Sequence, residues 1–252
     1  VPCPERHSLR DMEWMMKDGL YDLGIATDGD SDRIALYDQK GAYVDADTIL
    51  CLLYYYFKEY RMETGGIVRN VTTTHILDLI AESYGEPVYE VPVGFKHVAA
   101  KMEEHDLLLG GESSGGVMIR SHIKGKDGIL AALLCIEMMA KTGKTISELA
   151  YEVEQKYGAT VSYSMNRPVG PAARARISSV LFEARHVPDF PKPVQRTSYL
   201  DGVKFYFGDG SWCCLRLSGT EPVLRVFMEM KSKEEAIAFA NALNSYEVLN
   251  LI

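Results

Sequence analysis

Several features that define other protein classes are missing from this 252-residue sequence. No apolar run approaches the roughly 18 residues that a transmembrane helix needs. The first residues, Val1-Pro-Cys-Pro-Glu-Arg, lack the apolar segment of a secretory signal peptide. The five cysteines are odd in number and form no C-x-x-C motif, which favours reduced thiols. From these absences we expect a cytoplasmic protein that does not bind membranes.

An excess of positive charge is missing as well. The formal net charge is -8, so no general attraction to nucleic acid is expected. An anionic substrate would instead need local pockets of lysine and arginine. Apolar residues make up 47% of the chain and charged residues 25%, which is typical of a globular protein that buries a sizeable core.

The middle of the chain, residues 45 to 158, alternates strand-like and helix-like segments. Gly66–Val71 and Pro87–Val91 are short apolar runs that predict strands. Residues 127–142 are strongly apolar over a length that predicts a helix. This alternation is typical of an α/β layered domain, with helices packed on a mixed sheet.

The pattern changes in residues 159 to 252. Proline and charged residues become frequent between residues 166 and 196. Three strand-like runs follow at residues 202–207, 211–217 and 223–229, and a helix is expected from about residue 233 to 243. We therefore expect a smaller α+β domain with an antiparallel sheet.

Residues 1 to 44 hold only one predicted helix, Ser8–Lys17, and about three short strands. This is too little chain to enclose a core of its own. The chain also does not begin with methionine. We therefore expect a fragment whose larger N-terminal portion is missing. Apolar surface exposed on this segment would then favour self-association, disorder or altered packing of residues 1 to about 44.

Three aspartates alternate in the loop Asp28-Gly-Asp30-Ser-Asp32-Arg33, directly after a predicted strand. Carboxylates that converge in a tight loop repel one another by about 1 kcal/mol per pair in water, and by more when partly buried. A hard divalent cation removes that cost, and an all-oxygen donor set suits Mg²⁺ or Ca²⁺. The loop is therefore a candidate metal site, although a solvated Asp/Gly turn has the same composition.

Two other readings of the acidic loop can be compared with the sequence. An EF-hand beginning at Asp28 would need glycine at position 6 and glutamate at position 12, but Arg33 and Gln39 stand there. A phosphatase of the haloacid-dehalogenase type would use Asp28 as nucleophile and Asp30 as its partner. Ser31-Asp32 then replaces the usual Gly-Thr or Gly-Val, and this reading stays open as an alternative.

Two further candidate loops follow predicted strands in the middle of the chain. In Gly110-Gly-Glu112-Ser-Ser114-Gly-Gly116, glycine permits close backbone approach, and Glu112 and Ser114 offer groups suited to sugar hydroxyls. In Pro92-Val-Gly-Phe-Lys96-His97, Lys96 could contact a phosphate or transfer a proton. Each loop alone is weak evidence, because ordinary surface turns share these residues.

A fourth loop, Arg216-Leu-Ser218-Gly219-Thr220-Glu-Pro, joins two predicted strands. The Arg216 guanidinium can bind a phosphate with two parallel hydrogen bonds. Ser218 and Thr220 add hydroxyl donors, and Gly219 would let backbone N–H groups turn inward as an anion nest. Arg225, on the following strand, would extend this positive pocket.

Taken together and in this order, these motifs resemble the α-D-phosphohexomutases, the superfamily of phosphoglucomutase and phosphomannomutase. The resemblance rests on four segments: D-G-D-S-D-R at 28–33, V-G-F-K at 93–96, G-E-S-S-G-G at 111–116 and R-L-S-G-T-E-P at 216–222. The segment that begins Lys126-Asp-Gly also looks like the family's helix after the sugar loop.

The resemblance implies a division into parts of a four-domain enzyme. Residues 1–44 would be the C-terminal remnant of domain 2 with the metal loop. Residues 45–158 would be the sugar-binding domain 3, and residues 159–252 the phosphate-binding domain 4. It also implies an isomerase of carbohydrate metabolism that moves phosphate between the 1- and 6-positions of a hexose, such as glucose or mannose, through a bisphosphorylated sugar.

The same resemblance implies roles for individual residues. Mg²⁺ would be the cofactor, and hexose phosphates would be the substrates. The catalytic residues would be Arg33, beside the transferred phosphate, and Lys96, near the reacting end of the substrate. The remaining residues would bind metal (Asp28, Asp30, Asp32), sugar hydroxyls (Glu112, Ser114) and the phosphate that does not react (Arg216, Ser218, Gly219, Thr220, Arg225).

One family feature does not occur in this sequence. The family's nucleophile is a phosphoserine in a Ser-His-Asn-Pro loop, and no such tetrapeptide is present. We therefore expect the 252-residue chain to be inactive by itself. A non-catalytic sugar-phosphate-binding module is a further alternative.

Overall fold

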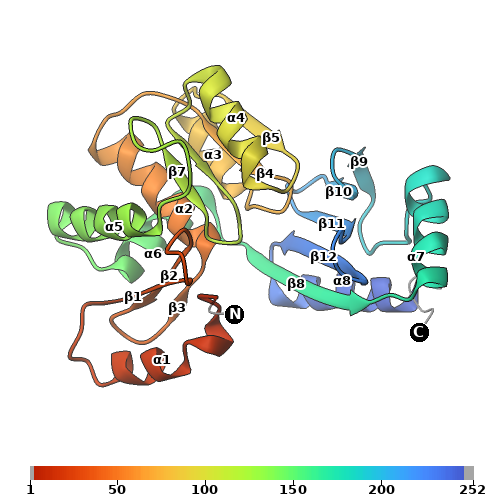
Figure 1. Cartoon of the computed structure of the whole chain (residues 1–252), viewed down its shortest axis with the longest axis horizontal. Coiled ribbons are helices and arrows are strands. Elements are labelled where there is room, and N and C mark those ends of the chain that lie inside the picture. The colour runs from red at the N-terminus through yellow and green to blue at the C-terminus, as the bar shows by residue number, and fades with distance from the viewer. Residues whose placement is uncertain (1–2, 247–252) are drawn as a thin grey trace. The chain divides into compact units, whose positions relative to one another are not determined.

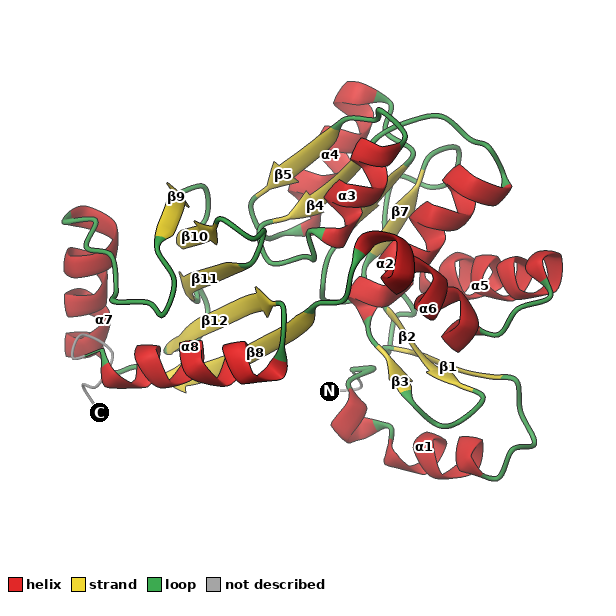
Figure 2. Cartoon of the chain, turned by 180° about the vertical axis from the view of Figure 1, so that it is seen from behind, coloured by secondary structure: helices red, strands yellow, loops and turns green. Residues whose placement is uncertain are grey.

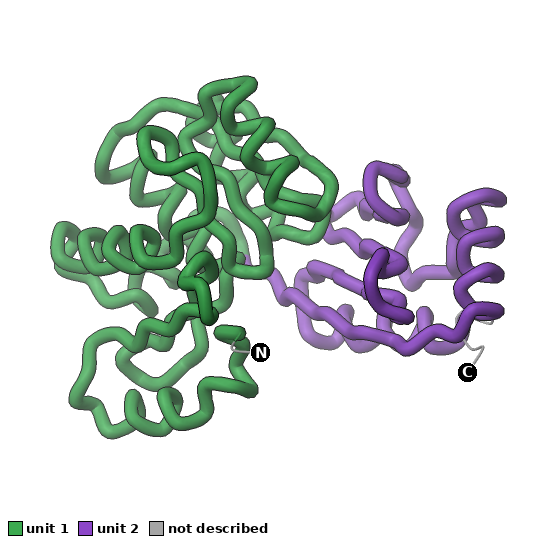
Figure 3. The backbone as a smooth tube through the Cα atoms, in the orientation of Figure 1, with its two compact units in different colours: residues 1–158 green, residues 159–252 purple. Residues whose placement is uncertain are grey.

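The computed structural model describes residues 3–246 and divides into two compact units, residues 1–158 and 159–252 (Figure 3). Within residues 3–246, no helix has both the length and the apolar character needed to cross a membrane.

The first unit opens with a small antiparallel meander beside a helix (Figure 1). Strands β1, β2 and β3 lie side by side in that order, so β1 is an edge strand. The acidic loop is the connection between β1 and β2. The bounds of these elements are η1 Arg6–Ser8, α1 Arg10–Lys17, β1 Leu23–Thr27, β2 Ile34–Asp38 and β3 Tyr43–Val44.

The larger part of the first unit is a mixed sheet of order β5-β4-β6-β7, in which only β7 runs antiparallel to its neighbour. The strands are β4 Ile67–Asn70, β5 Val88–Val91, β6 Leu109–Gly111 and β7 Val117–Ile119. The helices are α2 Ala46–Tyr55, continued as η2 Tyr56–Tyr60, then α3 Ile76–Ser83, α4 Phe95–His105, α5 Gly128–Thr142 and α6 Ile146–Tyr157.

Helices cover both faces of this sheet, as the view from behind also shows (Figure 2). Successive residues of a strand point to opposite faces. Accordingly, Ile67 packs with side chains of α2, α3, α5 and α6, whereas the next residue, Val68, packs with Val98 and Met102 of α4. The loops at the ends of β4, β5 and β6 are therefore held on a rigid three-layer support.

The second unit is a five-stranded antiparallel sheet of order β8-β12-β11-β10-β9. Its core lies between the sheet and the helices, where Phe205, Leu215 and Val226 pack with Phe239 and Leu243. The strands are β8 Val161–Pro168, β9 Val194–Ser198, β10 Val203–Phe207, β11 Trp212–Leu217 and β12 Val223–Met230. The helices are α7 Pro171–Ile177, continued as η3 Ser178–Glu183, and α8 Lys233–Ser245.

The predicted fold class is confirmed: a mixed α/β layer is followed by a smaller α+β part with an antiparallel sheet. The sequence pattern does not predict β7 in the first unit, or β8, β9, α7 and η3 in the second. Residues 3–44 pack within the same compact unit as residues 45–158. The division at residue 44 into separate domains stays a prediction.

Candidate functional site

The acidic loop is a tight turn organised around Asp28. One carboxylate oxygen of Asp28, Oδ1, accepts hydrogen bonds from the backbone N–H groups of Asp32 (3.0 Å) and Arg33 (3.1 Å). Ser31 has a positive φ of 59°, which closes the turn. These bonds fix the three alternating aspartates on one side of the loop.

The three aspartates fit a hard divalent cation. Asp28, Asp30 and Asp32 each offer one carboxylate oxygen, and these oxygens all lie within 4.8 Å of one another. Oδ2 of Asp28 lies 3.5 Å from Nε of Arg33, and a second ion pair joins Asp32 to Lys126. The donor set is entirely oxygen, which suits Mg²⁺, and the two nearby cations partly offset the carboxylate charge.

The acidic loop is bonded directly to the Gly/Ser-rich loop, although the two are far apart in the sequence. Arg33 and Gly116 form an antiparallel β-bridge, and the N–H of Ile34 donates to the carbonyl of Gly115 at 3.2 Å. The N–H of Gly128, at the start of α5, donates to the carbonyl of Ser31 at 3.0 Å. The first unit therefore brings together segments 28–34, 115–116 and 126–128.

Glu112, a predicted sugar ligand, is 7% exposed and is held by two donors. Its Oε1 accepts from Nδ2 of Asn70 (3.1 Å) and from the N–H of Gly94 (3.0 Å). The Ser114 hydroxyl lies 3.5 Å from the other oxygen, Oε2. Through Gly94, the carboxylate also ties the segment that carries Lys96 to this loop.

The two predicted catalytic residues have different surroundings. Lys96 is an exposed residue in the first turn of α4. Within residues 3–246 its side chain makes no ion pair or hydrogen bond. Arg33 lies between carboxylates: its Nε is 3.5 Å from Asp28 and 3.9 Å from Asp32, but it meets neither with hydrogen-bond geometry. Its positive charge therefore lies beside two of the three aspartates of the acidic loop.

In the second unit, two arginines lie opposite each other on the strands that flank the loop after β11. Arg216 on β11 and Arg225 on β12 are direct cross-strand partners. Like charges placed opposite each other destabilise a sheet unless anions lie nearby. Asp201 pairs with Arg216 at 2.9 Å, and Glu221 accepts a hydrogen bond from Arg225 at 2.5 Å. These two carboxylates offset the charge of the paired arginines.

The backbone of this loop differs from the expected anion nest. Gly219 does not adopt a positive φ. The N–H groups of Thr220 and Glu221 point at Oγ of Ser218, at 3.4 Å and 3.2 Å. The inward-turned amides therefore surround a hydroxyl oxygen, because the side chain of Ser218 is itself 6% exposed and folded into the turn.

Sequence reasoning missed several residues that contact these loops. Lys126 belongs to the segment that resembles a family helix, and its ammonium pairs with Asp32 and lies 5.7 Å from the ring centroid of Phe95. The motifs do not include Asn70 or Arg174. Arg174 donates to the carbonyl of Ser218 at 2.9 Å. Of these three residues, only Lys126 could have been suspected from the sequence, because it begins the segment that resembles the family's helix after the sugar loop.

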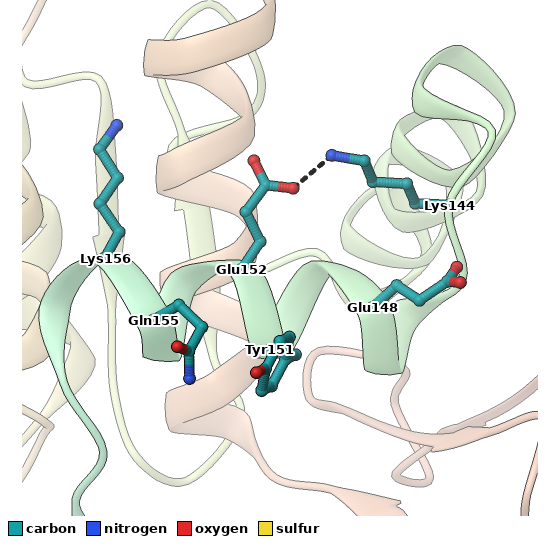
Figure 4. A pocket seen from close by; sticks show the side chains of 6 residues that line it. All are labelled: Lys144, Glu148, Tyr151, Glu152, Gln155 and Lys156. Atoms are coloured by element: carbon teal, nitrogen blue, oxygen red, sulfur yellow. Dashed lines mark hydrogen bonds and ion pairs between the residues drawn. The ribbon is translucent and has the colours of Figure 1, made fainter.

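A surface pocket of about 580 Å³ lies elsewhere in the first unit, along α6. Figure 4 shows the ion pair between Lys144 and Glu152 at this pocket. Its lining contains none of the predicted site residues: Lys144, Glu148, Tyr151, Glu152, Gln155, Lys156. It is separate from the candidate site.

The fold and the loops define a protein built from an α/β layer and an antiparallel α+β unit, with an acidic loop bonded to a Gly/Ser-rich loop. Two family models match this chain. Residues 45–157 match the phosphoglucomutase/phosphomannomutase alpha/beta/alpha domain III, and residues 171–244 match the C-terminal domain of the same family. The chain belongs to the phosphoglucomutase/phosphomannomutase family, within the α-D-phosphohexomutase superfamily.

Individual relatives agree with this membership. A phosphoglucomutase/phosphomannomutase of Thermococcus kodakarensis is 32% identical over 93% of this chain and 49% of its own length. A phosphoglucosamine mutase of Rubrobacter xylanophilus is 34% identical over 85% of this chain and 45% of its own length. A crystal structure from Thermus thermophilus, provisionally described as a phosphomannomutase, superposes with a TM-score of 0.79 at 27% identity, covering 96% of this chain and 50% of that one. The chain thus spans about half the length of the relatives it matches.

Proposed function

We propose that the protein carrying this chain is an intramolecular phosphotransferase that interconverts hexose 1-phosphates and hexose 6-phosphates. The observation that carries the proposal is the direct bonding of the acidic loop to the Gly/Ser-rich loop, through Arg33 and Gly116, in a chain that belongs to the mutase family. This bonding supports a site in which a cation and sugar-binding groups act on one substrate.

The acidic loop is proposed to hold Mg²⁺ through Asp28, Asp30 and Asp32. A bound Mg²⁺ would neutralise negative charge on the phosphoryl group that is transferred. Arg33 is proposed to share this task, because its Nε lies within 4 Å of two of the three carboxylates and the guanidinium is a permanent positive charge beside the loop. Lys96 is proposed to contact the reacting end of the substrate, where it could also move a proton.

The remaining predicted residues are proposed to bind the substrate. Glu112 and Ser114 would bind sugar hydroxyls. The loop after β11 would hold the phosphate that does not react. That phosphate would neutralise the positive charges of the cross-strand partners Arg216 and Arg225. The residues of this second group are Arg216, Ser218, Gly219, Thr220 and Arg225.

The phosphatase alternative has less support. The aspartates lie in a loop that joins the antiparallel strands β1 and β2 of a meander. This position of the acidic loop counts against a phosphatase of the haloacid-dehalogenase type. One oxygen of Asp28 accepts two backbone hydrogen bonds, and the other faces Arg33. These partners restrain the Asp28 carboxylate, which favours a role as a metal ligand over a role as a nucleophile. A cytoplasmic location also remains part of the proposal.

Binding to the 252-residue chain can be measured by titration calorimetry with glucose 6-phosphate and mannose 6-phosphate, in the presence of Mg²⁺. We expect weak binding that Arg216→Ala abolishes and Arg196→Ala leaves unchanged. Arg196 is a matched control, because it lies on β9 and stacks over Tyr206 at 3.7 Å. Binding that is unaffected by Arg216→Ala would contradict the proposed phosphate site.

Activity is tested on the gene product that contains this sequence, by conversion of glucose 1-phosphate to glucose 6-phosphate and of the mannose pair. We expect Asp30→Asn to lose activity. Asp22→Asn is the control and should keep it, because Asp22 is exposed and precedes β1. No conversion of any hexose phosphate would overturn the proposal. Binding without conversion would favour a non-catalytic module.

A further inference from the structure

The end of β4 carries a buried hydrogen-bond network centred on Asn70, which is 2% exposed. Its Oδ1 accepts from the N–H of Thr72, the hydroxyl of Thr72 and the hydroxyl of Thr73, each at 2.9 Å. Its Nδ2 donates to Oε1 of Glu112 at 3.1 Å. All four side chains belong to the first unit, and none is more than 7% exposed.

Thr73 extends this network to the Gly/Ser-rich loop. Its hydroxyl donates to Asn70 and accepts from the N–H of Ser113 at 3.1 Å. The hydroxyls of Thr72 and Ser113 also lie 3.0 Å apart. A buried donor or acceptor that loses its partner is costly, so these bonds fix the loop to the strand end.

The two oxygens of Glu112 are therefore not equivalent. Oε1 is saturated by Asn70 and by the N–H of Gly94. Oε2 has only the Ser114 hydroxyl, at 3.5 Å, among residues 3–246. The terminal torsion of a glutamate is broad, so a free carboxylate would interchange its oxygens. With Oε1 bound on two sides, only Oε2 remains available.

Gly94 supplies this N–H from an unusual backbone conformation. Gly94 has φ 123° and ψ 117°, a region that L-residues with a side chain rarely adopt. The same carboxylate oxygen thus connects the end of β4, the Lys96 segment and the Gly/Ser-rich loop. Its orientation is set by these partners before any ligand binds.

We propose that Asn70 and Thr73 are positioning residues of the sugar site, which hold Glu112 so that Oε2 is the oxygen that accepts a hydrogen bond from a substrate hydroxyl. This inference rests on the proposed function for the identity of the ligand. The positioning itself rests on the network alone. It assigns roles to two residues outside the motifs from which the family was recognised.

Two nearly isosteric substitutions test the network. Thr73→Val removes the hydroxyl and leaves the N–H of Ser113 without its acceptor. Asn70→Asp keeps the acceptor oxygen for Thr72 and Thr73, but it removes the donor to Glu112 and adds a negative charge. Thr73→Ser, which keeps the hydroxyl, serves as the rescue variant. Asn241→Asp, on an exposed position of α8, is the matched control.

The first measurement is amide hydrogen exchange by NMR on the 252-residue chain without ligand. We expect the Gly94 amide to exchange about tenfold faster in Asn70→Asp, and the Ser113 amide about tenfold faster in Thr73→Val. Thr73→Ser and Asn241→Asp should exchange like the wild type. Wild-type exchange in both Asn70→Asp and Thr73→Val would overturn the positioning role. If Thr73→Val does not fold, the Gly94 amide of Asn70→Asp decides the outcome, and wild-type exchange there overturns the positioning role.

The second measurement is the ratio of affinities for glucose 6-phosphate and inorganic phosphate. A merely structural role would leave this ratio unchanged. We expect both substitutions to weaken glucose 6-phosphate binding about tenfold and to leave inorganic phosphate binding unchanged. An unchanged ratio, together with faster exchange, would overturn the assignment of Oε2. If the wild type binds no glucose 6-phosphate, the proposed function fails, and the exchange rates still decide the positioning role.

Discussion

The ammonium of Lys126 pairs with the carboxylate of Asp32, so a cation from the start of the α5 segment lies against the acidic loop. The methylene groups of Lys126 also pack against the Gly/Ser-rich loop, because a side chain added at Gly116 would collide with them. One side chain thus contacts both loops that the proposed reaction needs. Its charge competes with any divalent cation for the same carboxylate.

Lys126→Met is therefore expected to tighten Mg²⁺ binding. The substitution keeps the apolar stem that packs at Gly116 and removes a positive charge beside Asp32. Two unit charges about 4 Å apart interact by about 1 kcal/mol in water. Removal of the Lys126 charge should therefore change the affinity for Mg²⁺ roughly fivefold. Calorimetric Mg²⁺ titration measures it. Lys124→Met, which removes an exposed partner of Glu103, is the control. Weaker Mg²⁺ binding in Lys126→Met would show that the ammonium organises the loop instead.

Gly115 fixes the contact between the acidic loop and the Gly/Ser-rich loop. Its φ is 100°, and a Cβ there would lie 2.9 Å from the carbonyl oxygen of Ile34. Gly115→Ala should destabilise the chain by about 1–3 kcal/mol, since it combines backbone strain with a close contact. Urea denaturation measures this change. Gly125→Ala is the matched control, because open space surrounds Gly125, and it should change stability little.

Edge strand β1 and the surface beside it are expected to support self-association with a second copy of the chain. Trp14 is 74% exposed and Leu20 is 78% exposed, and among the described residues β1 pairs with a strand on one side only. An edge strand offers unpaired backbone groups to a like strand. Sedimentation velocity over a range of concentrations should show dimers that Leu20→Lys weakens. Ile237→Lys, at an exposed position of α8, should not weaken them. A monomer at every concentration would contradict this prediction.

The sequence predicted the regular elements best where a strand or helix is strongly apolar. The α5 helix was expected from residue 127 to 142, and it runs from Gly128 to Thr142. By contrast, β8 was missed, because Ser, Tyr, Asn and Arg give it an irregular pattern. This edge strand is stabilised by its register with β12 along its whole length, and such pairing is a property of tertiary context. Helix α7 was missed for another reason. Pro171 stands in its first turn, where proline favours a helix instead of breaking it.

The candidate site was predictable only in part. The motifs supplied Glu112 and the three aspartates, because alternating carboxylates and glycine-rich loops carry a local signal. The network through Asn70 and Thr73 carries none, because a polar residue at a strand end has the composition of any loop. Its importance follows from β4 and β6 being neighbours in the sheet, which brings Asn70 to Glu112. Local patterns cannot specify which strands become neighbours.

Asp127 links the stability of the first unit to pH. It is the N-cap of α5, and its Oδ1 accepts from the N–H of Leu130 at 2.8 Å. This bond, together with the side chain of His122 at 2.7 Å from Oδ2, lowers the pKa of the Asp127 carboxyl. A carboxyl whose pKa is lower in the folded chain stabilises that chain above its unfolded pKa of about 4, and the contribution is lost as the pH falls through the folded value.

Asp127→Ala should therefore cost about 1 kcal/mol of unfolding free energy at neutral pH, and this difference should shrink as the solution is acidified below about pH 4. Urea denaturation at a series of pH values measures it. Asp127→Asn is the control, because an amide oxygen still accepts from Leu130 but does not titrate in this range. Its stability should therefore lack the acid-dependent loss that the wild type shows at this position. A cost of Asp127→Ala that stays constant from about pH 7 to about pH 3 would show that the carboxylate charge does not stabilise α5.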